Sequence, residues 1–295
     1  ELRKTYEVVG NTITEAMQNL YLKSSKKAYL SHVETLLLSE EVAKTDTSFL
    51  LDFFLGNPQS RNAFTTIIVK GSSPSSLLKN TDQTPDINDM IEINNQEYGI
   101  TSRITFEDFA RMLLEEGKDA ILPTIKVEDD LLEIDGYAYF KENKFQSYLC
   151  KEESITYNLL KNLNSLLLIT SDCNSQQVSA QLENLRTKMQ AKQNKINIHI
   201  TGSLSVLENQ CGFSHQQILD TFEEQITQEV RHLLNQQKIW SSDILGMQSL
   251  VRQNNYSYYQ KNKKNLLSHL SFDVTTKFSY QNDASSERND RHATK

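Results

Sequence analysis

The chain has 295 residues, of which 38% are hydrophobic and 23% charged, and its formal net charge is −7. This length and composition predict a globular protein of two or three domains. The acidic balance argues against a general nucleic-acid binder, because such proteins need a basic face to displace counterions from phosphates. No apolar run reaches the roughly 18 residues of a membrane span, and the sequence shows no signal peptide at its start.

The cysteines are three, an odd number without a CxxC pair: Cys150, Cys173 and Cys211. One disulfide is possible, and a disulfide framework is not. The spacing leaves open whether any two of them pair, and three inert, partly buried thiols are the simplest interpretation. Such sparse use of cysteine does not identify the redox compartment.

Helix and strand signals alternate through residues 1–126, which predicts an N-terminal α/β domain. Thr105 and Asp108 form a capping-box pattern at the start of one helix, and Pro123 suits an edge strand or a strand start. The polar residues 80–96 predict a surface excursion. Helices are expected at residues 11–22, 45–55 and 105–116, and strands at residues 28–38, 65–70 and 120–127.

A small middle domain is expected at residues 127–174. Tyrosines at positions 137 and 139 alternate with Ala138 and Phe140, and a polar turn follows, so residues 133–149 predict an antiparallel hairpin. We expect this hairpin to turn at residues 142–144 and to lie in a domain separate from residues 1–126. Gly136 permits a bulge or a close backbone approach, and a helix is expected at residues 152–163.

Residues 175–280 predict a C-terminal domain. Apolar residues alternate with period two over residues 175–210, as in an antiparallel sheet with one polar face. A long amphipathic helix begins at Ser214, where Gln217 completes a capping box, and Gly246 is a candidate for its end. A closing strand is expected at residues 268–280, and residues 281–295 predict a disordered tail. The apolar stripe expected to cover the sheet is Leu219, Phe222, Ile226, Val230 and Leu233.

These elements predict an α+β protein of three domains, with a long C-terminal helix packed on an antiparallel sheet. They carry no visible catalytic centre. The six histidines show no metal-ligand spacing, and the phosphate-binding loops and the nucleophile elbow are missing. Neighbouring acids such as Glu115 and Glu116 point apart on a helix or strand. We therefore expect no catalytic residue, no bound cofactor and no metal, and a protein that is not an enzyme.

One segment mixes basic and aromatic side chains and is the candidate partner surface: Tyr256, Tyr258, Tyr259, Lys261, Lys263 and Lys264. Such a mixture is typical of nucleic-acid sites. In an acidic chain, a loop that rests on a protein partner or on an anionic membrane face fits better. A solvated loop without a partner is the simplest alternative.

Five stretches, taken in order, resemble the Ger(x)C family, the C subunit of bacterial spore germinant receptors. No one of them is specific, but together they span almost the whole chain. The family's usual start, with a signal peptide and a lipid-modified cysteine, is not visible, and residues 247–252 match its pattern only loosely. The stretches are VGNTITEAMQNLYLKSSKKAYLSHVETLLLS (9–39), LLDFFLGNPQSR (50–61), EDFARMLLEEGKDAIL (107–122), IDGYAYFKENKFQSYL (134–149) and QKIWSSDILG (237–246).

The resemblance implies a non-enzymatic lipoprotein on the outer face of the spore inner membrane. It would work there with multi-spanning membrane subunits of a germinant receptor, held by a lipid anchor upstream of this chain. The resemblance supplies no catalytic residue. Two other classes of function remain open: an extracytoplasmic lipoprotein that itself binds a small molecule, and a hydrolase whose site is assembled from scattered residues. If the chain is a subunit of a germinant receptor, residues 80–96 and 256–264 are the expected contact surfaces.

Overall fold

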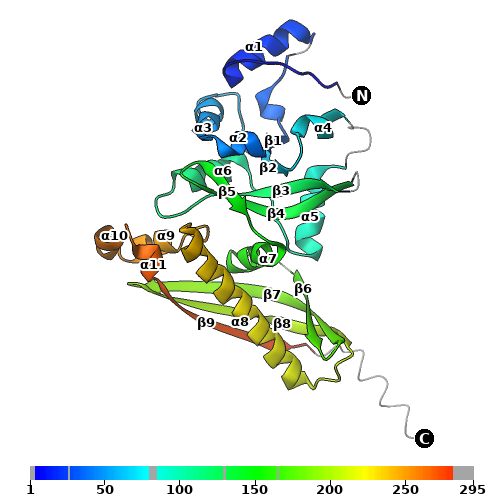
Figure 1. The fold of residues 1–295 in the computed structure, drawn as a ribbon, viewed down its shortest axis with the longest axis vertical. Helices are drawn as coiled ribbons and strands as arrows, with labels where there is room; N and C mark the ends of the chain where they lie inside the picture. Colours follow the sequence, from blue (N-terminus) through cyan, green and yellow to red (C-terminus); the bar gives the residue numbers. More distant parts are fainter. Residues whose placement is uncertain (1–3, 26, 80–84, 129–130, 165, 282–295) are drawn as a thin grey trace, which may run out of the picture. The chain divides into compact units, whose positions relative to one another are not determined.

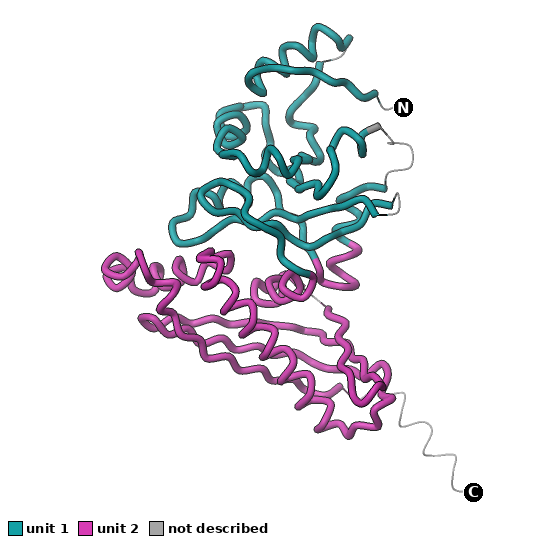
Figure 2. Tube along the Cα trace, in the orientation of Figure 1, with its two compact units in different colours: residues 1–92, 101–150 teal, residues 93–100, 151–295 magenta. Residues whose placement is uncertain are grey.

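The structure is a computed structural model that describes residues 4–25, 27–79, 85–128, 131–164 and 166–281. The chain divides into two compact units, residues 1–92 with 101–150 and residues 93–100 with 151–295 (Figure 2). Each unit is built around one β-sheet (Figure 1). The class is α+β, as the sequence predicts.

The first unit holds a five-stranded sheet in the order β1-β2-β3-β4-β5. β1, β2 and β3 are parallel, and β4 and β5 continue the sheet in antiparallel pairs. Five of the six residues of β2 are buried, as in a parallel strand covered on both faces. The strands are β1 (Thr35–Ser39), β2 (Thr65–Lys70), β3 (Ile121–Glu128), β4 (Leu131–Lys141) and β5 (Lys144–Tyr148).

Short helices connect these strands. The capping box at the start of α6 is confirmed: the Thr105 side chain accepts from the backbone N–H of Asp108, and the Asp108 carboxylate accepts from that of Thr105. The Phe54 ring lies 4.9 Å from both Phe64 and Phe106, between centroids, in the core beside the sheet. The helices are α1 (Ile13–Lys23), α2 (Glu40–Lys44), α3 (Ser48–Leu55), α4 (Pro74–Lys79), α5 (Ile87–Glu97) and α6 (Phe106–Leu114), with a 3₁₀ turn at Leu30–His32. From Ile93 on, α5 belongs to the second unit.

The predicted hairpin is confirmed as β4 and β5. Its turn residues Glu142 and Asn143 have φ of 49° and 62°, the left-handed pair of a tight hairpin. Gly136, at φ 93°, lies where the register of β4 against β3 shifts, so the expected bulge is present. The hairpin does not lie apart from residues 1–126, because β4 pairs with β3 from Leu131 to Tyr139.

The expected middle domain, residues 127–174, is divided between the two units. Its hairpin extends the first sheet, while the helix that follows belongs to the second unit. The reason is that β4 pairs with the outer side of β3. Without β4, β3 would be an edge strand with unpaired backbone groups. The three-domain division itself stays a prediction.

Three local expectations in the first unit differ from the structure. The expected strand at residues 28–38 forms only from Thr35, after a 3₁₀ turn. The expected excursion at residues 80–96 is a helix, α5, from Ile87, with Ile91 buried; residues 80–84 lie outside the described part. Pro123 lies inside β3, which is a central strand, but one residue before its ladder with β2 begins. The missing N–H therefore removes no bond of that ladder.

The second unit holds a four-stranded sheet in the order β6-β7-β8-β9. The period-two prediction for residues 175–210 is confirmed by β7 and β8, which form a long antiparallel pair. β9 runs parallel to β8, so the sheet is mixed and not purely antiparallel. The chain between these two strands passes through four helices, the long crossover that a parallel pair requires. The strands are β6 (Leu166–Cys173), β7 (Gln176–Lys192), β8 (Lys195–Asn209) and β9 (Ser271–Tyr280).

The long helix α8 runs from His215 to Trp240 and packs on one face of this sheet (Figure 1). Ser214 and Gln217 form the predicted capping box. Four residues of the predicted stripe are buried, but Leu219 is only half-buried and its neighbour Ile218 takes the inner position. The other helices of the unit are α7 (Lys151–Leu160), α9 (Met247–Asn254), α10 (Tyr256–Asn262) and α11 (Leu266–His269).

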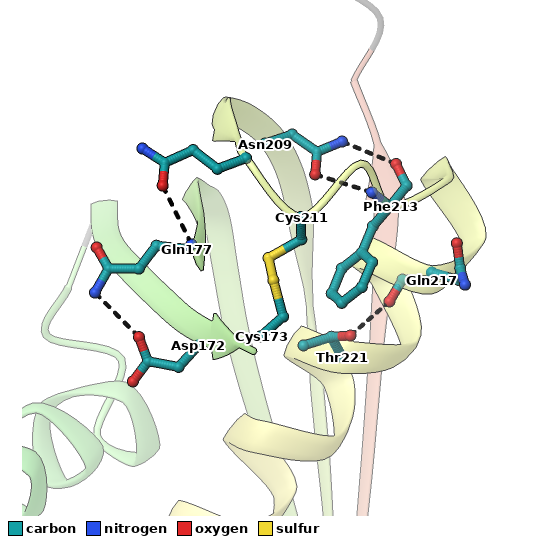
Figure 3. The surroundings of a disulfide bond; sticks show 9 residues. Asp172, Cys173, Gln177, Asn209, Cys211, Phe213, Gln217 and Thr221 are labelled. Atoms are coloured by element: carbon teal, nitrogen blue, oxygen red, sulfur yellow. Dashed lines mark hydrogen bonds between the residues drawn. A yellow bond between two sulfur atoms is a disulfide. The ribbon is translucent and has the colours of Figure 1, made fainter. Parts of the chain in front are cut away.

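A disulfide joins Cys173 at the end of β6 to Cys211 in the connection from β8 to α8 (Figure 3). Around it, the Asn209 side chain accepts from the backbone N–H of Phe213 and donates to that residue's carbonyl. The bridge and this pair of hydrogen bonds fix the point where the chain leaves the sheet and enters α8. Cys150 is exposed and lies outside the bridge.

Candidate interaction surface

The connection that follows α8 is ordered by two buried polar side chains. The carboxylate of Asp243, which is 1% exposed, accepts from the backbone N–H groups of Met247 and Gln248 at 2.8 and 2.7 Å. The amide oxygen of Gln237, fully buried, accepts from the N–H of Leu245 at 3.0 Å. Asp243 thus caps the next turn, as predicted. Gln237 and Asp243, which both belong to the QKIWSSDILG stretch, fix the backbone that follows α8.

The end of α8 differs from the sequence prediction. α8 ends at Trp240, and its C-cap, Ser241, takes the left-handed conformation at φ 52°, five residues before Gly246. Gly246 is also left-handed, at φ 71°, and it stands at the start of α9. At this end the N–H of Ser241 donates to the Lys238 carbonyl and that of Ser242 to the Gln237 carbonyl. A serine in the left-handed conformation is not a pattern that the sequence reveals.

The predicted loop at residues 256–264 is largely helical. The side chain of Asn255 accepts from the N–H of Tyr258 and starts α10. Tyr256 is 61% exposed, Tyr258 is half-buried, and Tyr259 is 3% exposed. Tyr259 therefore belongs to the core of the unit and not to an accessible surface.

The three predicted lysines line a hollow at one end of the second sheet. The hollow has a volume of about 530 Å³, and we call it the basic hollow. Lys261, Lys263 and Lys264 are exposed on it. No aspartate or glutamate lines it among the described residues. Its lining is Asn194, Tyr258, residues 260–266 and His269.

The β7–β8 hairpin turn reaches the same place. The side-chain amide of Asn194, in that turn, donates to the carbonyl of His269 at 3.2 Å, and the N–H of Ser271 donates to the carbonyl of Asn194 at 2.8 Å. These bonds hold the hairpin tip against the segment that carries α10 and α11. Lys192 and Lys195, which flank the turn, are exposed there as well.

The charge at this end of the unit is segregated along the sequence. Residues 184–207 and 244–272 hold eight lysines and arginines and no aspartate or glutamate. At the average frequency of 38 acids in 295 residues, these 53 positions would hold about seven. Asp273 follows the second stretch and pairs with Lys195 at 3.0 Å. Sequence reasoning found the three lysines of one stretch but missed Asn194, His269 and the hairpin lysines, although the lack of acids is readable from the sequence.

A second hollow, of about 640 Å³, lies at the carboxyl ends of β1 and β2 in the first unit. It is lined by residues 37–42, Lys44 and residues 71–75. The carboxyl ends of parallel strands are the usual ligand position in open α/β sheets. Sequence reasoning did not identify this place, because it depends on which strands become neighbours.

Polar groups beside this hollow are already paired. Hydrogen bonds from Lys44 and from the Tyr148 hydroxyl lower the pKa of the Glu40 carboxyl. Burial, and then the Glu40 carboxylate, raise the pKa of Tyr148. Lys70 pairs with Asp135 at 2.6 Å and lies over the Tyr148 ring. This network holds α2 against β5. Serines of the hollow are paired as well, because the Ser39 hydroxyl accepts from the Val42 N–H and the hydroxyls of Ser73 and Ser75 are 2.8 Å apart.

Within the described ranges, no group of three histidine, cysteine or acidic side chains is arranged to hold a metal ion. His232 lies 3.6 Å from the carboxylate of Glu153, and this pair is isolated from further metal-ligating groups in the described residues. Residues 4–25, 27–79, 85–128, 131–164 and 166–281 also contain no helix that is long and apolar enough to cross a membrane.

Two family models match the chain in order. The model described as "Spore germination protein N-terminal domain" matches residues 2–127, and the one described as "Spore germination B3/GerAC like, C-terminal" matches residues 135–282. The chain belongs to the Ger(x)C family of spore germination proteins. The resemblance drawn from the five sequence stretches is thereby confirmed.

Family relatives show how far the likeness extends. Spore germination protein KC of Bacillus subtilis (strain 168) is 21% identical over 91% of this chain and 76% of its own length. Spore germination protein GerQC of Bacillus cereus is 24% identical over 53% of this chain and 45% of its own length. The crystal structure of the GerBC protein has a TM-score of 0.67 over 91% of this chain and 85% of that one, at 18% identity. This last likeness shows that the two chains share a fold.

Proposed function

We propose that this Ger(x)C chain is a non-enzymatic subunit of a membrane-associated germinant receptor and that it acts by contact with membrane-spanning subunits. The observation that carries the proposal is the match of both family models, in order, along one chain. In the second unit, the buried oxygens of Gln237 and Asp243 accept from backbone N–H groups, which gives both residues a structural role.

The proposed location is the outer face of the spore inner membrane, with a lipid anchor upstream of this chain. The disulfide between Cys173 and Cys211 supports an extracytoplasmic position, because disulfides persist in oxidising compartments and are rare in the cytosol. A single lipid chain gives only marginal membrane binding. Contacts made by the folded chain would therefore have to contribute to its retention.

The candidate protein contact is the exposed side of α5. Ile93 on this helix is 60% exposed, and Tyr98 just after it is 54% exposed. Exposed large apolar side chains at a helix surface are a common feature of protein contacts. The test is to purify the tagged full-length lipoprotein from spore membranes and to identify the receptor subunits that accompany it. Loss of those subunits in Ile93→Glu, with the fold intact, would support α5, and their absence from the wild-type preparation would contradict the proposal.

A second function, direct binding of a small molecule, is favoured by the hollow at the carboxyl ends of β1 and β2. Isothermal titration calorimetry with amino acids and sugars tests it. Saturable heat that disappears in a variant with a bulky residue at the hollow, such as Ser72→Trp, would support this function. A flat titration would leave surface contact as the function of the chain.

A further inference from the structure

We propose that the basic hollow binds the phosphate groups of an anionic phospholipid surface. The proposal deepens the proposed function, on whose membrane location it rests, by naming lipid as the partner of residues 258–269. It places the β7–β8 hairpin tip and α10 against the membrane face.

The first support is the charge. The hollow is the meeting point of the two acid-free stretches, one through the hairpin and one through α9, α10 and α11. Lys261, Lys263 and Lys264 are exposed on it, and Lys192 is exposed beside it. Lys195 also lies beside it, but its charge is paired with Asp273. In a chain of net charge −7, this local excess of positive charge sets one end of the second unit apart. Clustered lysines are attracted to anionic headgroups when they come within a Debye length of the surface.

The second support is the kind of donor. Lysine ammonium groups and the side-chain amides of Gln260 and Asn265 line the hollow, while the amide of Asn194 already donates to the His269 carbonyl. Charged and amide N–H donors suit phosphate oxygens, which accept several hydrogen bonds at once. A carboxylate would repel a phosphate, and the described lining contains none.

The third support is the lack of exposed aliphatic side chains in the hollow, which favours lipid over a protein partner. A stable protein interface needs an apolar centre, but Leu266 is the one aliphatic residue in the lining and it is 1% exposed. Tyr256, exposed just before the lysines, instead combines with them as aromatic and basic side chains do at the membrane–water interface. The surface is therefore better suited to a charged headgroup layer than to the apolar anchor of another protein.

The test is co-sedimentation of the chain with phosphatidylcholine vesicles, with and without phosphatidylglycerol. We expect the wild-type chain to bind the anionic vesicles, and to bind less as added salt shortens the Debye length from about 8 Å toward about 3 Å. The triple variant Lys261→Glu, Lys263→Glu, Lys264→Glu should lower the partition coefficient by about a hundredfold or more, since each lysine near such a surface contributes about fivefold.

The matched control makes the same change of charge elsewhere. Lys4, Lys27 and Lys151 are exposed and lie outside both acid-free stretches. The variant Lys4→Glu, Lys27→Glu, Lys151→Glu should keep at least most of the binding. Because all six lysines are exposed, both variants should fold, and circular dichroism with thermal unfolding verifies this.

Equal binding of the wild-type chain to neutral and anionic vesicles, or equal loss in both triple variants, would overturn the inference. Loss of receptor subunits from the Lys261–Lys263–Lys264 variant without any vesicle binding by the wild-type chain would make this surface a protein interface, which overturns the inference and leaves the proposed function standing. Selective binding of the wild-type chain to anionic vesicles, without any associated receptor subunits, would support the inference and contradict the proposed function.

Discussion

Phe222 is fully buried on the face of α8 that covers the second sheet. Truncation to alanine removes its ring and leaves a cavity that the helix and sheet can fill only in part. We expect Phe222→Ala to lower the free energy of unfolding by about 3–5 kcal/mol, measured by denaturant unfolding. Ile239 on the same helix is 73% exposed, so Ile239→Ala is the control, with an expected change below about 0.5 kcal/mol. A change below about 1 kcal/mol for Phe222→Ala would place the stripe outside the core.

Glu40 gives the chain a small dependence on pH. Lys44 and Tyr148 lower the pKa of its carboxyl below the usual 4.5. A carboxyl with a lower pKa in the folded state adds stability that is complete above the unfolded pKa and is lost as pH falls through the folded one. Lys44 is more than half exposed, so we expect the contribution to stay below about 1 kcal/mol.

The corresponding test compares Glu40→Gln with the wild type by denaturant unfolding at a series of pH values. The variant should be less stable near neutral pH, and the difference should shrink between about pH 5 and pH 3. The adjacent exposed Glu41→Gln serves as the control. A Glu40→Gln difference that stays constant over this range would show that the ion pair does not carry the effect.

At the residue scale, the sequence was informative where the partner is close by. Thr105 with Asp108, and Ser214 with Gln217, lie three residues apart, so their capping boxes could be predicted. The burial of Tyr259 could not, because a mixed basic and aromatic segment has no apolar period that assigns each tyrosine to a face. The choice between Ile218 and Leu219 was likewise decided by the sheet beneath the helix.

Among the contacts between secondary-structure elements, we expect the disulfide to have the largest effect on the free energy of unfolding. Cys173 and Cys211 are 38 residues apart and join β6 to the start of α8. Closing a loop of that length restricts the unfolded chain by about 4 kcal/mol. We expect the double variant Cys173→Ser, Cys211→Ser to lose stability up to that amount, measured by denaturant unfolding, and reduction of the wild-type chain to have the same effect.

Cys150 supplies the matched control for this prediction. It is exposed and lies outside the bridge, so Cys150→Ser should leave the free energy of unfolding within about 0.5 kcal/mol of the wild type. Equal stability of the double serine variant and the wild type under oxidising conditions would show that the bridge does not form in the protein.

Elements with local signals were predicted best. The β4–β5 hairpin and the β2 strand carry their turn residues and their apolar run within a few positions. The pairing of β4 with β3 and the parallel pairing of β9 with β8 join distant segments, and strand patterns do not reveal their partners. The cysteine pair belongs to the same class, since its two residues become neighbours only when the sheet forms.

At the scale of the whole molecule, the chain is a Ger(x)C protein of two compact units. The notable charge pattern is confined to one end of the second unit, where the β7–β8 hairpin meets α10 and α11. Individual lysines were visible in the sequence, but the hollow they line exists because Asn194 is bonded to the His269 backbone across 75 positions. A surface of this kind is assembled by topology, so composition alone cannot locate it.

We propose that the chain acts as a receptor subunit through its surface. The most direct measurement is to purify the full-length lipoprotein from spore membranes and identify what accompanies it by mass spectrometry. We expect membrane-spanning receptor subunits to be recovered in a fixed ratio with the chain. Recovery of the chain alone, under conditions in which a known receptor complex remains intact, would contradict it.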